Sequence, residues 1–370
     1  MLYHHLTPQK IVNPALLATY SLRGFPNAFG AGGNRFFFGA ENVSGSGTYV
    51  TTGATVNPDG SYNVGTSATI PNVNTFTFAN VSPNSNLTNY AAYLSSSTTG
   101  NESNPGAWAW TPDSNFYAYG YYSVSGTGRT SHIGLYNCTS GSPTLQQTIN
   151  LTAGSAQLPA CMVWLGSNLI VGLWDGQSGA AGLLFSIYSK DPSTNNLTLV
   201  SSGIDLGIKG YLWNAVATDG SHFFLNGAKP SSASAYAGML CQYYLRFDSS
   251  TNTFTNITVP GINTNPVVST VSAAASLVAA TFFTYNGQNI VFFKDNTRGA
   301  TWQDCFCYVN GDTITSVSTY DLFVNAAGAK IAPWFYYAYP TAGKFYIFVN
   351  LPVTNQIQVY SYNLADMFGS

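Results

Sequence analysis

A short polar turn opens a run of bulky apolar residues at six places along this chain, and the spacing between these places is close to regular. Successive turns are 81, 53, 53, 68 and 55 residues apart. They are Gly33-Asn34, Ser114-Asn115, Ser167-Asn168, Gly220-Ser221, Gln288-Asn289 and Gly343-Lys344. A repeat near 50 residues that contains only strand-like segments is typical of a β-propeller, in which each repeat supplies one blade. The repeat therefore predicts an all-β fold, with residues 1–370 forming a single propeller domain.

Each repeat holds up to four strand-like segments. They are clearest in the third repeat, as Cys161 to Trp164, Asn168 to Trp174, Leu183 to Tyr188 and Leu197 to Ile204. The first step is too long for one blade and short for two, and residues 71–106 are rich in Asn and Ser. We interpret 71–106 as an irregular insertion that contains two strand-like pieces, Thr75 to Phe78 and Tyr90 to Leu94. The prediction is six blades, with seven as the alternative.

The last repeat has three strand-like segments, which end with Gln356 to Tyr362, and then the sequence stops. The first strand-like segment of the chain, Leu16 to Leu22, has no partner before it. Pairing these two segments would remove an exposed sheet edge. We therefore expect the N-terminal strand to close the ring on the C-terminal blade.

Composition restricts the partners that this chain can have. Charged residues make up 7%, against about 25% in a typical soluble domain, and the formal net charge is −2. The basic residues are scattered, so nucleic acid is not expected as a partner. No apolar stretch is long enough for a membrane span. A neutral, aromatic-rich surface favours assembly, including a homo-oligomer, and a monomer is the alternative.

Binding residues on a rigid scaffold usually lie in its longer loops. Here we expect these between the second and third strands of each blade, at residues 41–47, 123–131, 175–181, 226–237, 295–301 and 350–355. Four of them begin with a polar residue, and these four residues are Glu41, Asp175, Asn226 and Asp295. They are candidates for a binding ring around the channel mouth. The alternative is that Asp and Asn at these places simply begin turns.

Arg298 and Trp302 complete the candidate binding set. Their segment, residues 296–302, resembles the tail of the Asp-box of sialidase-like propellers, but Thr297 occupies the Asp position and the motif occurs once. That family also needs three arginines, a tyrosine and a glutamate, and the whole chain has five arginines and two glutamates. We treat the match as chance.

No catalytic, metal or cofactor motif stands out. The adjacent His4 and His5 near the terminus are not expected to hold a metal. His132 and His222 stand alone at strand starts and are interpreted as structural. The five cysteines show no zinc spacing and are interpreted as small buried side chains. The few titratable groups predict stability that hardly changes from about pH 7 to pH 3.

The composition, poor in Lys and Glu and rich in Tyr, Asn, Ser and Thr, resembles that of surface proteins of thermoacidophilic archaea and their viruses. This resemblance implies a non-enzymatic virion structural or surface protein, located on a virion or an extracellular surface. It would mediate attachment or assembly through its propeller face, with other virion or surface proteins or host-cell glycans as partners. The alternative is a secreted carbohydrate-active propeller enzyme or lectin. The first 17 residues do not predict a secretory signal, which fits release with a particle or a trimmed mature chain equally.

Overall fold

A computed structural model of the protein describes residues 10–11, 15–20, 29–32, 35–41, 49–56, 62–64, 100–102, 108–113, 115–125, 128–137, 139, 144–151, 157–175, 182–209, 212–229, 239–257, 280–295, 303–321, 335–340, 343–351 and 356–369. Within these ranges almost all regular structure is β-strand, and one short helix, α2 (Leu364–Phe368), follows the last strand. The all-β prediction is confirmed. In the described part of the chain, no helix is long and apolar enough to cross a membrane.

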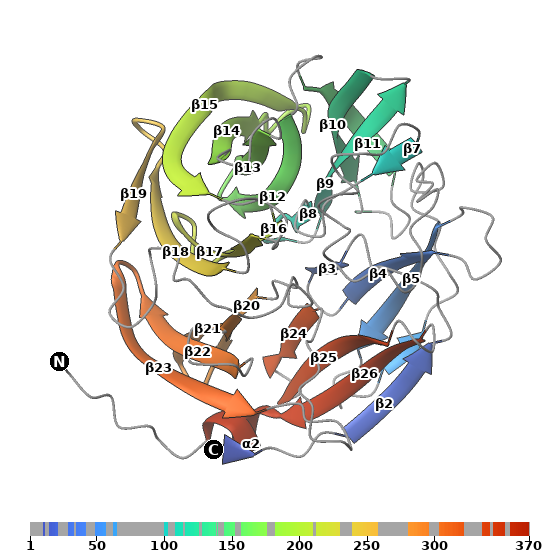
Figure 1. The fold of residues 1–370 in the computed structure, drawn as a ribbon, viewed down its shortest axis with the longest axis vertical. Helices are drawn as coiled ribbons and strands as arrows, with labels where there is room; N and C mark the ends of the chain where they lie inside the picture. The colour runs from blue at the N-terminus through green and yellow to red at the C-terminus, as the bar shows by residue number, and fades with distance from the viewer. Residues whose placement is uncertain are drawn as a thin grey trace.

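The strands form six sheets arranged in a ring around a common centre (Figure 1). Four sheets follow the chain order: β3 (Phe29–Gly32), β4 (Arg35–Glu41), β5 (Tyr49–Val56) and β6 (Tyr62–Val64); β12 (Gln157–Leu165), β13 (Asn168–Asp175), β14 (Gly182–Lys190) and β15 (Leu197–Lys209); β16 (Leu212–Ala217), β17 (His222–Lys229), β18 (Met239–Asp248) and β19 (Thr253–Ile257); β20 (Ala280–Tyr285), β21 (Gln288–Asp295), β22 (Gln303–Asn310) and β23 (Thr313–Asp321).

A fifth sheet contains β24 (Phe335–Tyr339), β25 (Lys344–Leu351), β26 (Gln356–Asn363) and β2 (Ala15–Tyr20). The sixth contains β7 (Gly100–Glu102), β8 (Trp108–Trp110), β9 (Phe116–Ser125), β10 (Gly128–Asn137) and β11 (Thr144–Asn150). The strands predicted for the third repeat are confirmed as β12 to β15. Two of them are considerably longer than expected, since β12 begins at Gln157 and β15 ends at Lys209.

The number of equivalent blades differs from the prediction. Among the described residues, five sheets have the regular order of four antiparallel strands, and the sixth does not, because β7 and β8 both pair with β9. The prediction of six blades, or seven as the alternative, is therefore wrong. The fold is a β-propeller with five regular blades, and an irregular sheet occupies the remaining place in the ring.

The irregular sheet has a physical cause in the sequence between β7 and β8. Residues 103–107 include Pro105 and Gly106. Proline cannot donate a ladder hydrogen bond and glycine weakens a strand, so a continuous inner strand is disfavoured here. Part of the predicted insertion, β7, thus joins the sheet. The strand-like pieces expected at 75–78 and 90–94 lie outside the described residues.

The N-terminal strand closes the ring, as predicted. β2 pairs antiparallel with β26, from Ala15 opposite Ser361 to Tyr20 opposite Ile357. Just before it, β1 (Lys10–Ile11) pairs in parallel with β23 on the neighbouring blade. The first segments of the chain therefore lie on the outer edges of two successive blades.

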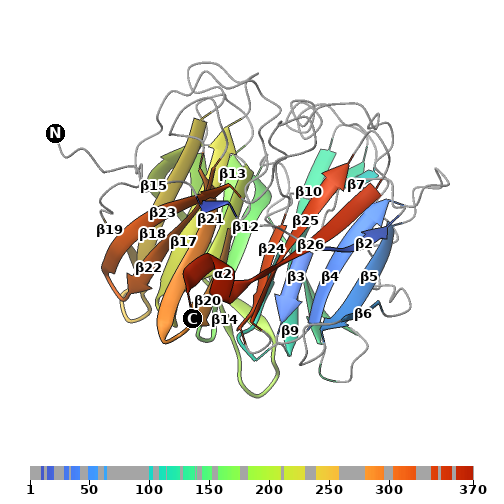
Figure 2. The same ribbon diagram turned by 90° about the horizontal axis from the view of Figure 1, so that it is seen from below.

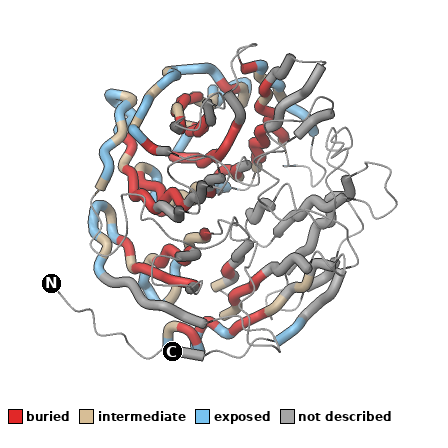
Figure 3. The backbone as a smooth tube through the Cα atoms, in the orientation of Figure 1, coloured by how far each residue is buried: buried red, intermediate tan, exposed pale blue. Residues whose placement is uncertain are grey.

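Burial explains why the inner strands are almost continuously apolar. Phe223, Phe224 and Leu225 follow one another in β17 and are all fully buried, because both faces of the blade pack against neighbouring blades. The outer strands β11 and β19 are mostly exposed (Figure 3). The cysteines Cys161, Cys305 and Cys307 are buried, as expected. Cys138 and the side chain of Cys241 lie outside the described residues.

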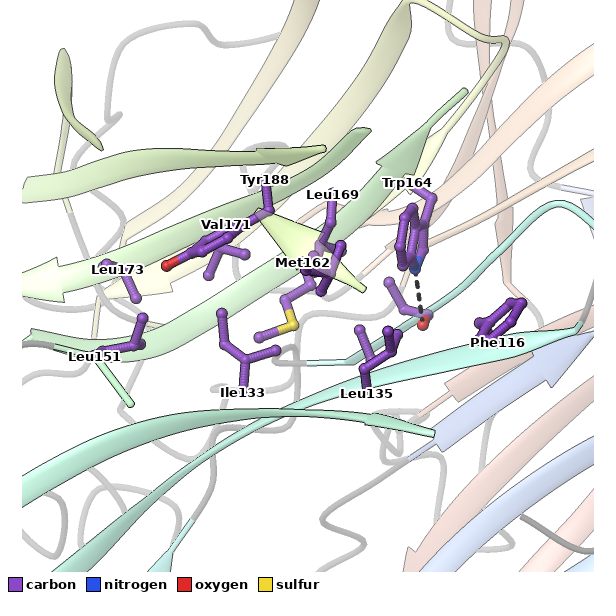
Figure 4. Close-up of a cluster of buried hydrophobic side chains, with 13 residues drawn as sticks. Phe116, Ile133, Leu135, Leu151, Met162, Trp164, Leu169, Val171, Leu173 and Tyr188 are labelled. Carbon is purple, nitrogen blue, oxygen red and sulfur yellow. Dashed lines mark hydrogen bonds between the residues drawn. The ribbon is translucent and has the colours of Figure 1, made fainter. Parts of the chain in front are cut away.

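The cluster between sheet β7–β11 and blade β12–β15 illustrates the packing between blades (Figure 4). Met162 and Val171 pack against Ile133 and other apolar side chains of the neighbouring sheet. Trp164 Nε1 donates a hydrogen bond of 3.3 Å to the backbone oxygen of Ala109 on β8. The indole therefore contributes both apolar contact and a polar link to this interface.

Removing the closing strand is expected to destabilise the whole ring. A chain that lacks residues 1–22 loses β1 and β2 and exposes the edge of β26, whereas a chain that lacks residues 1–12 loses only β1. Thermal unfolding followed by circular dichroism should give a much lower Tm for the longer deletion. Equal Tm values would show that β2 does not hold the ring closed.

Gly120 on β9 is expected to tolerate no side chain. A Cβ atom there would lie 2.4 Å from Pro159 Cβ and 2.6 Å from Met162 Cε, across the interface to β12. Gly120→Ala should therefore lower the free energy of unfolding by about 1–3 kcal/mol. Gly220→Ala is the control, because a Cβ atom there has no neighbour within 4 Å. Denaturant unfolding of both variants tests this prediction. Equal losses in the free energy of unfolding would contradict the close packing at Gly120.

Candidate functional site

The structure places the predicted binding residues at strand ends or beyond the described ranges. Glu41, Asp175 and Asp295 are the last residues of β4, β13 and β21, and their side chains are not among those described. Arg298 and Trp302 lie outside the described residues. A binding role for these five residues stays a prediction.

Asn226 differs from the other candidates because it lies inside a strand. β17 continues to Lys229, so Asn226 does not begin a loop as the sequence suggested. Its side chain is fully buried, and Gln242 Nε2 donates a hydrogen bond of 3.2 Å to its Oδ1. The amide is therefore part of the blade interior in this structure.

Asn226 belongs to a row of three amides across one blade. Asn214 on β16 is opposite Asn226, and Asn226 is opposite Gln242 on β18, so the three side chains share one face. Phe224 and Tyr244 occupy the next positions on this face and pack against blade β20–β23. The Oδ1 atom of Asn214 is buried and has no hydrogen-bond partner. On this face of the blade, the apolar side chains of Phe224 and Tyr244 are thus followed by a row of amides.

The two ends of the propeller differ in their connections. In blades β12–β15, β16–β19 and β20–β23, the second and third strands are joined by residues 176–181, 230–238 and 296–302. The opposite end of these blades carries shorter turns, among them 166–167, 218–221, 286–287 and 311–312. The long loop expected at 123–131 is wrong, because Gly128 pairs with Ser125 and only residues 126–127 lie between β9 and β10. We call the two ends the loop end and the turn end.

The turn end carries a cluster of four charged or titratable side chains, the His222 cluster (Asp219, His222, Arg246 and Asp312). His222 Nδ1 lies 2.8 Å from Asp219 Oδ2, and its Nε2 lies 2.7 Å from Asp312 Oδ1. The Arg246 guanidinium donates to the other carboxylate oxygen of Asp312. Asp312 comes from the turn between β22 and β23, so the cluster joins two blades.

Tyr244 contacts the cluster through both its ring and its hydroxyl. Its ring stacks on the His222 ring, with the centroids 5.6 Å apart. Its hydroxyl donates a hydrogen bond of 2.9 Å to the backbone oxygen of Gly311, beside Asp312, and lies 3.0 Å from Thr218 Oγ1. Burial raises the pKa of Tyr244 to about 12, so the phenol stays neutral.

Asp219 is held as an anion. Partial burial raises the pKa of its carboxyl, but the hydrogen bonds donated by the Ser221 backbone and the His222 side chain outweigh this effect. With further bonds from the His222 backbone and the Ser221 hydroxyl, they keep the pKa below its usual range. Asp219 therefore lies in the turn between β16 and β17 and contacts His222, which also contacts Asp312 on the neighbouring blade.

Further contacts also join neighbouring blades at the turn end, among them those of Lys190 and Asn286. Lys190 on β14 bonds Asn195 Oδ1 at 2.9 Å, and its ammonium lies 4.6 Å from the centroid of the Phe116 ring on the neighbouring sheet. Asn286 Nδ2, in the turn between β20 and β21, donates a 3.3 Å hydrogen bond to the backbone oxygen of Gly369 beyond α2. The turn end therefore fastens blades together through specific polar contacts.

The sequence interpretation of His222 as structural agrees with these contacts, but the cluster itself was not predicted. Asp219 and His222 are three residues apart in one turn, which is a local signal. Asp312 is 90 residues further along the chain, and its proximity follows only from the register between blades. Within the described ranges, no group of three or more His, Cys, Asp or Glu side chains is arranged to hold a metal ion.

The amide row is expected to contribute unequally to stability. Asn226→Leu would leave the buried Gln242 Nε2 without the acceptor it uses in this structure, at a cost of about 1–3 kcal/mol. Asn214→Leu makes the same change on the adjacent strand, where the Oδ1 atom has no partner to lose. Denaturant unfolding should show a clearly larger loss for Asn226→Leu. A larger loss for Asn214→Leu would mean that Asn214 binds a group essential to the fold.

Comparison with known proteins gives no family. No family model and no curated protein matches this chain. Among solved structures it is similar to TolB from Acinetobacter baumannii, with 13% identity, TM-score 0.39 and 89% of this chain aligned to 63% of that one. A putative 6-phosphogluconolactonase from Bacteroides uniformis has 11% identity, TM-score 0.44 and coverage of 89% and 78%. A subtype N10 neuraminidase-like protein of A/little yellow-shouldered bat has 8% identity, TM-score 0.44 and coverage of 95% and 97%.

The chain thus spans less than two thirds of the TolB structure. All three neighbours are β-propeller proteins. The fold assignment of this chain rests on its own strand pairing.

Proposed function

We propose that this chain is a non-enzymatic surface protein that binds a partner through the loop end of its propeller. The observation that carries the proposal is the difference between the two ends of the ring. The contacts of His222, Lys190 and Asn286 between blades all lie at the turn end. The longer connections, 176–181, 230–238 and 296–302, begin and end at the opposite end.

This difference between the two ends supports recognition of a partner at the loop end. A scaffold that is fastened at one end can vary the connections at the other end without losing its blade packing. The predicted binding residues Asp175 and Asp295 are the last residues of strands that lead into these connections. The loop end therefore combines rigid strand ends with polar side-chain types.

The partner that we propose is a neutral glycan or a neutral protein surface on a virion or a host cell. The composition supports this choice, since the chain combines 7% charged residues with 15% aromatic residues and a net charge of −2. Aromatic rings with amides and hydroxyls suit stacking and hydrogen bonding rather than charge pairing. The virion or surface location rests on the same composition and its resemblance to proteins of that setting.

Replacing one connection at the loop end tests whether that end binds the partner. In the first variant, residues 230–238 between β17 and β18 are replaced by a two-residue Asn-Gly turn, and in the control, the turn 249–252 of the same blade is replaced in the same way. On an array of neutral glycans and on host-cell surface fractions, the first variant should lose binding while the control keeps it. Circular dichroism verifies that both variants fold.

Turnover assays separate binding from catalysis. Glycoside hydrolysis requires a pair of carboxylates, and Asp175 and Asp295 are the candidates at the loop end. We expect no glycoside cleavage by the native chain. Cleavage that disappears in Asp175→Ala or Asp295→Ala would replace the proposal with a carbohydrate-active enzyme, and binding that survives exchange of every connection would exclude the loop end.

A further inference from the structure

We infer that the His222 cluster is a pH-dependent latch between blades β16–β19 and β20–β23, which is closed when His222 carries a proton. The geometry is the basis of this inference. Both ring nitrogens of His222 face carboxylate oxygens, Nδ1 at 2.8 Å from Asp219 and Nε2 at 2.7 Å from Asp312. The two carboxylates belong to turns of different blades.

A neutral histidine cannot satisfy both contacts. The neutral ring has one N–H donor and one lone pair, whereas the protonated ring has two N–H donors. An ionised carboxylate has only acceptor atoms, so a neutral ring would direct its lone pair at one of the two aspartates. The observed arrangement therefore matches the imidazolium, whose two hydrogen bonds are charge-assisted.

The surrounding groups are consistent with this charge. The His222 side chain is 9% exposed, and those of Asp219 and Asp312 are 41% and 50% exposed. Arg246 is the other cation of the cluster, and it pairs with the second oxygen of Asp312. Tyr244 stacks on the ring, and Cys307 lies behind Tyr244; burial raises the pKa of each to about 12, so both are neutral.

The direction of the pH effect follows from linkage. A folded state that holds the protonated ring between two carboxylates gains stability in mild acid and loses it as the pH rises and the proton leaves. The carboxylate of Asp219, whose folded pKa is lowered, contributes above its unfolded pKa of about 3.9 and loses its contribution as the pH falls through the folded value. The latch is therefore expected to be strongest in mild acid, where Asp219 is ionised and the ring carries its proton.

Nitrogen chemical shifts measure the proton directly. The chain has four histidines, so labelling with ¹⁵N-histidine gives a simple spectrum. The variant with His4→Gln, His5→Gln and His132→Gln keeps His222 as its histidine and leaves the cluster intact. At pH 7, where a histidine with the ordinary pKa of about 6.5 is mostly neutral, the folded protein should still show both ring nitrogens of His222 protonated. A neutral ring with one protonated nitrogen would overturn the inference.

The dependence of the Tm on pH tests whether the latch stabilises the fold. The Tm of the native chain should fall between pH 5 and pH 8 by about 2 °C. His222→Gln should remove this fall, while His132→Gln should keep it, because His132 faces the neutral amide of Asn150 at 2.8 Å. Asp312→Asn should also remove the fall, since it takes away the carboxylate of the second blade. Identical profiles for His222→Gln and the native chain would overturn the inference.

Discussion

Burial of both faces of every blade is the constraint on which the rest of this structure depends. Side chains that follow one another in a strand, such as Phe223, Phe224 and Leu225, are all fully buried, so neither face of the strand can remain open. A row of such sheets satisfies this requirement only when its first and last members meet. The pairing of β2 with β26 completes the last blade, which makes the N-terminal segment part of the core architecture.

Close approach between blades limits the side chains at their interfaces. Gly120 contacts Pro159 and Met162 without room for a methyl group, and Trp164 reaches across to the backbone of Ala109. Interfaces this tight transmit strain, because interiors are packed to the density of organic crystals. Polar contacts that join the blades are accordingly found at the turn end of the ring, where His222 and Lys190 are anchored by short turns.

The sequence predicts regular blades well and contacts between blades poorly. Apolar runs separated by Gly- and Asn-containing turns determine β12 to β15 and the closing role of β2, since both signals are local. The irregular sheet does not follow from the sequence, because Pro105 and Gly106 lie in an Asn- and Ser-rich stretch that is typical of a loop. The sequence predicts a loop that begins at Asn226, whereas β17 continues to Lys229 and Gln242 on the next strand donates to the amide oxygen of Asn226.

Low charge gives each remaining ion pair more influence on the behaviour of the ring. With 14 acidic and 12 basic residues in 370, few groups can respond to pH. Among the described residues, Asp219, His222, Arg246 and Asp312 form one cluster at a single joint between blades. The near-constant stability expected from the sequence stays a prediction, and this joint is the place where we infer a departure from it. The latch that we infer at this joint would be strongest in mild acid, because the protonated His222 ring can donate to a carboxylate of each blade.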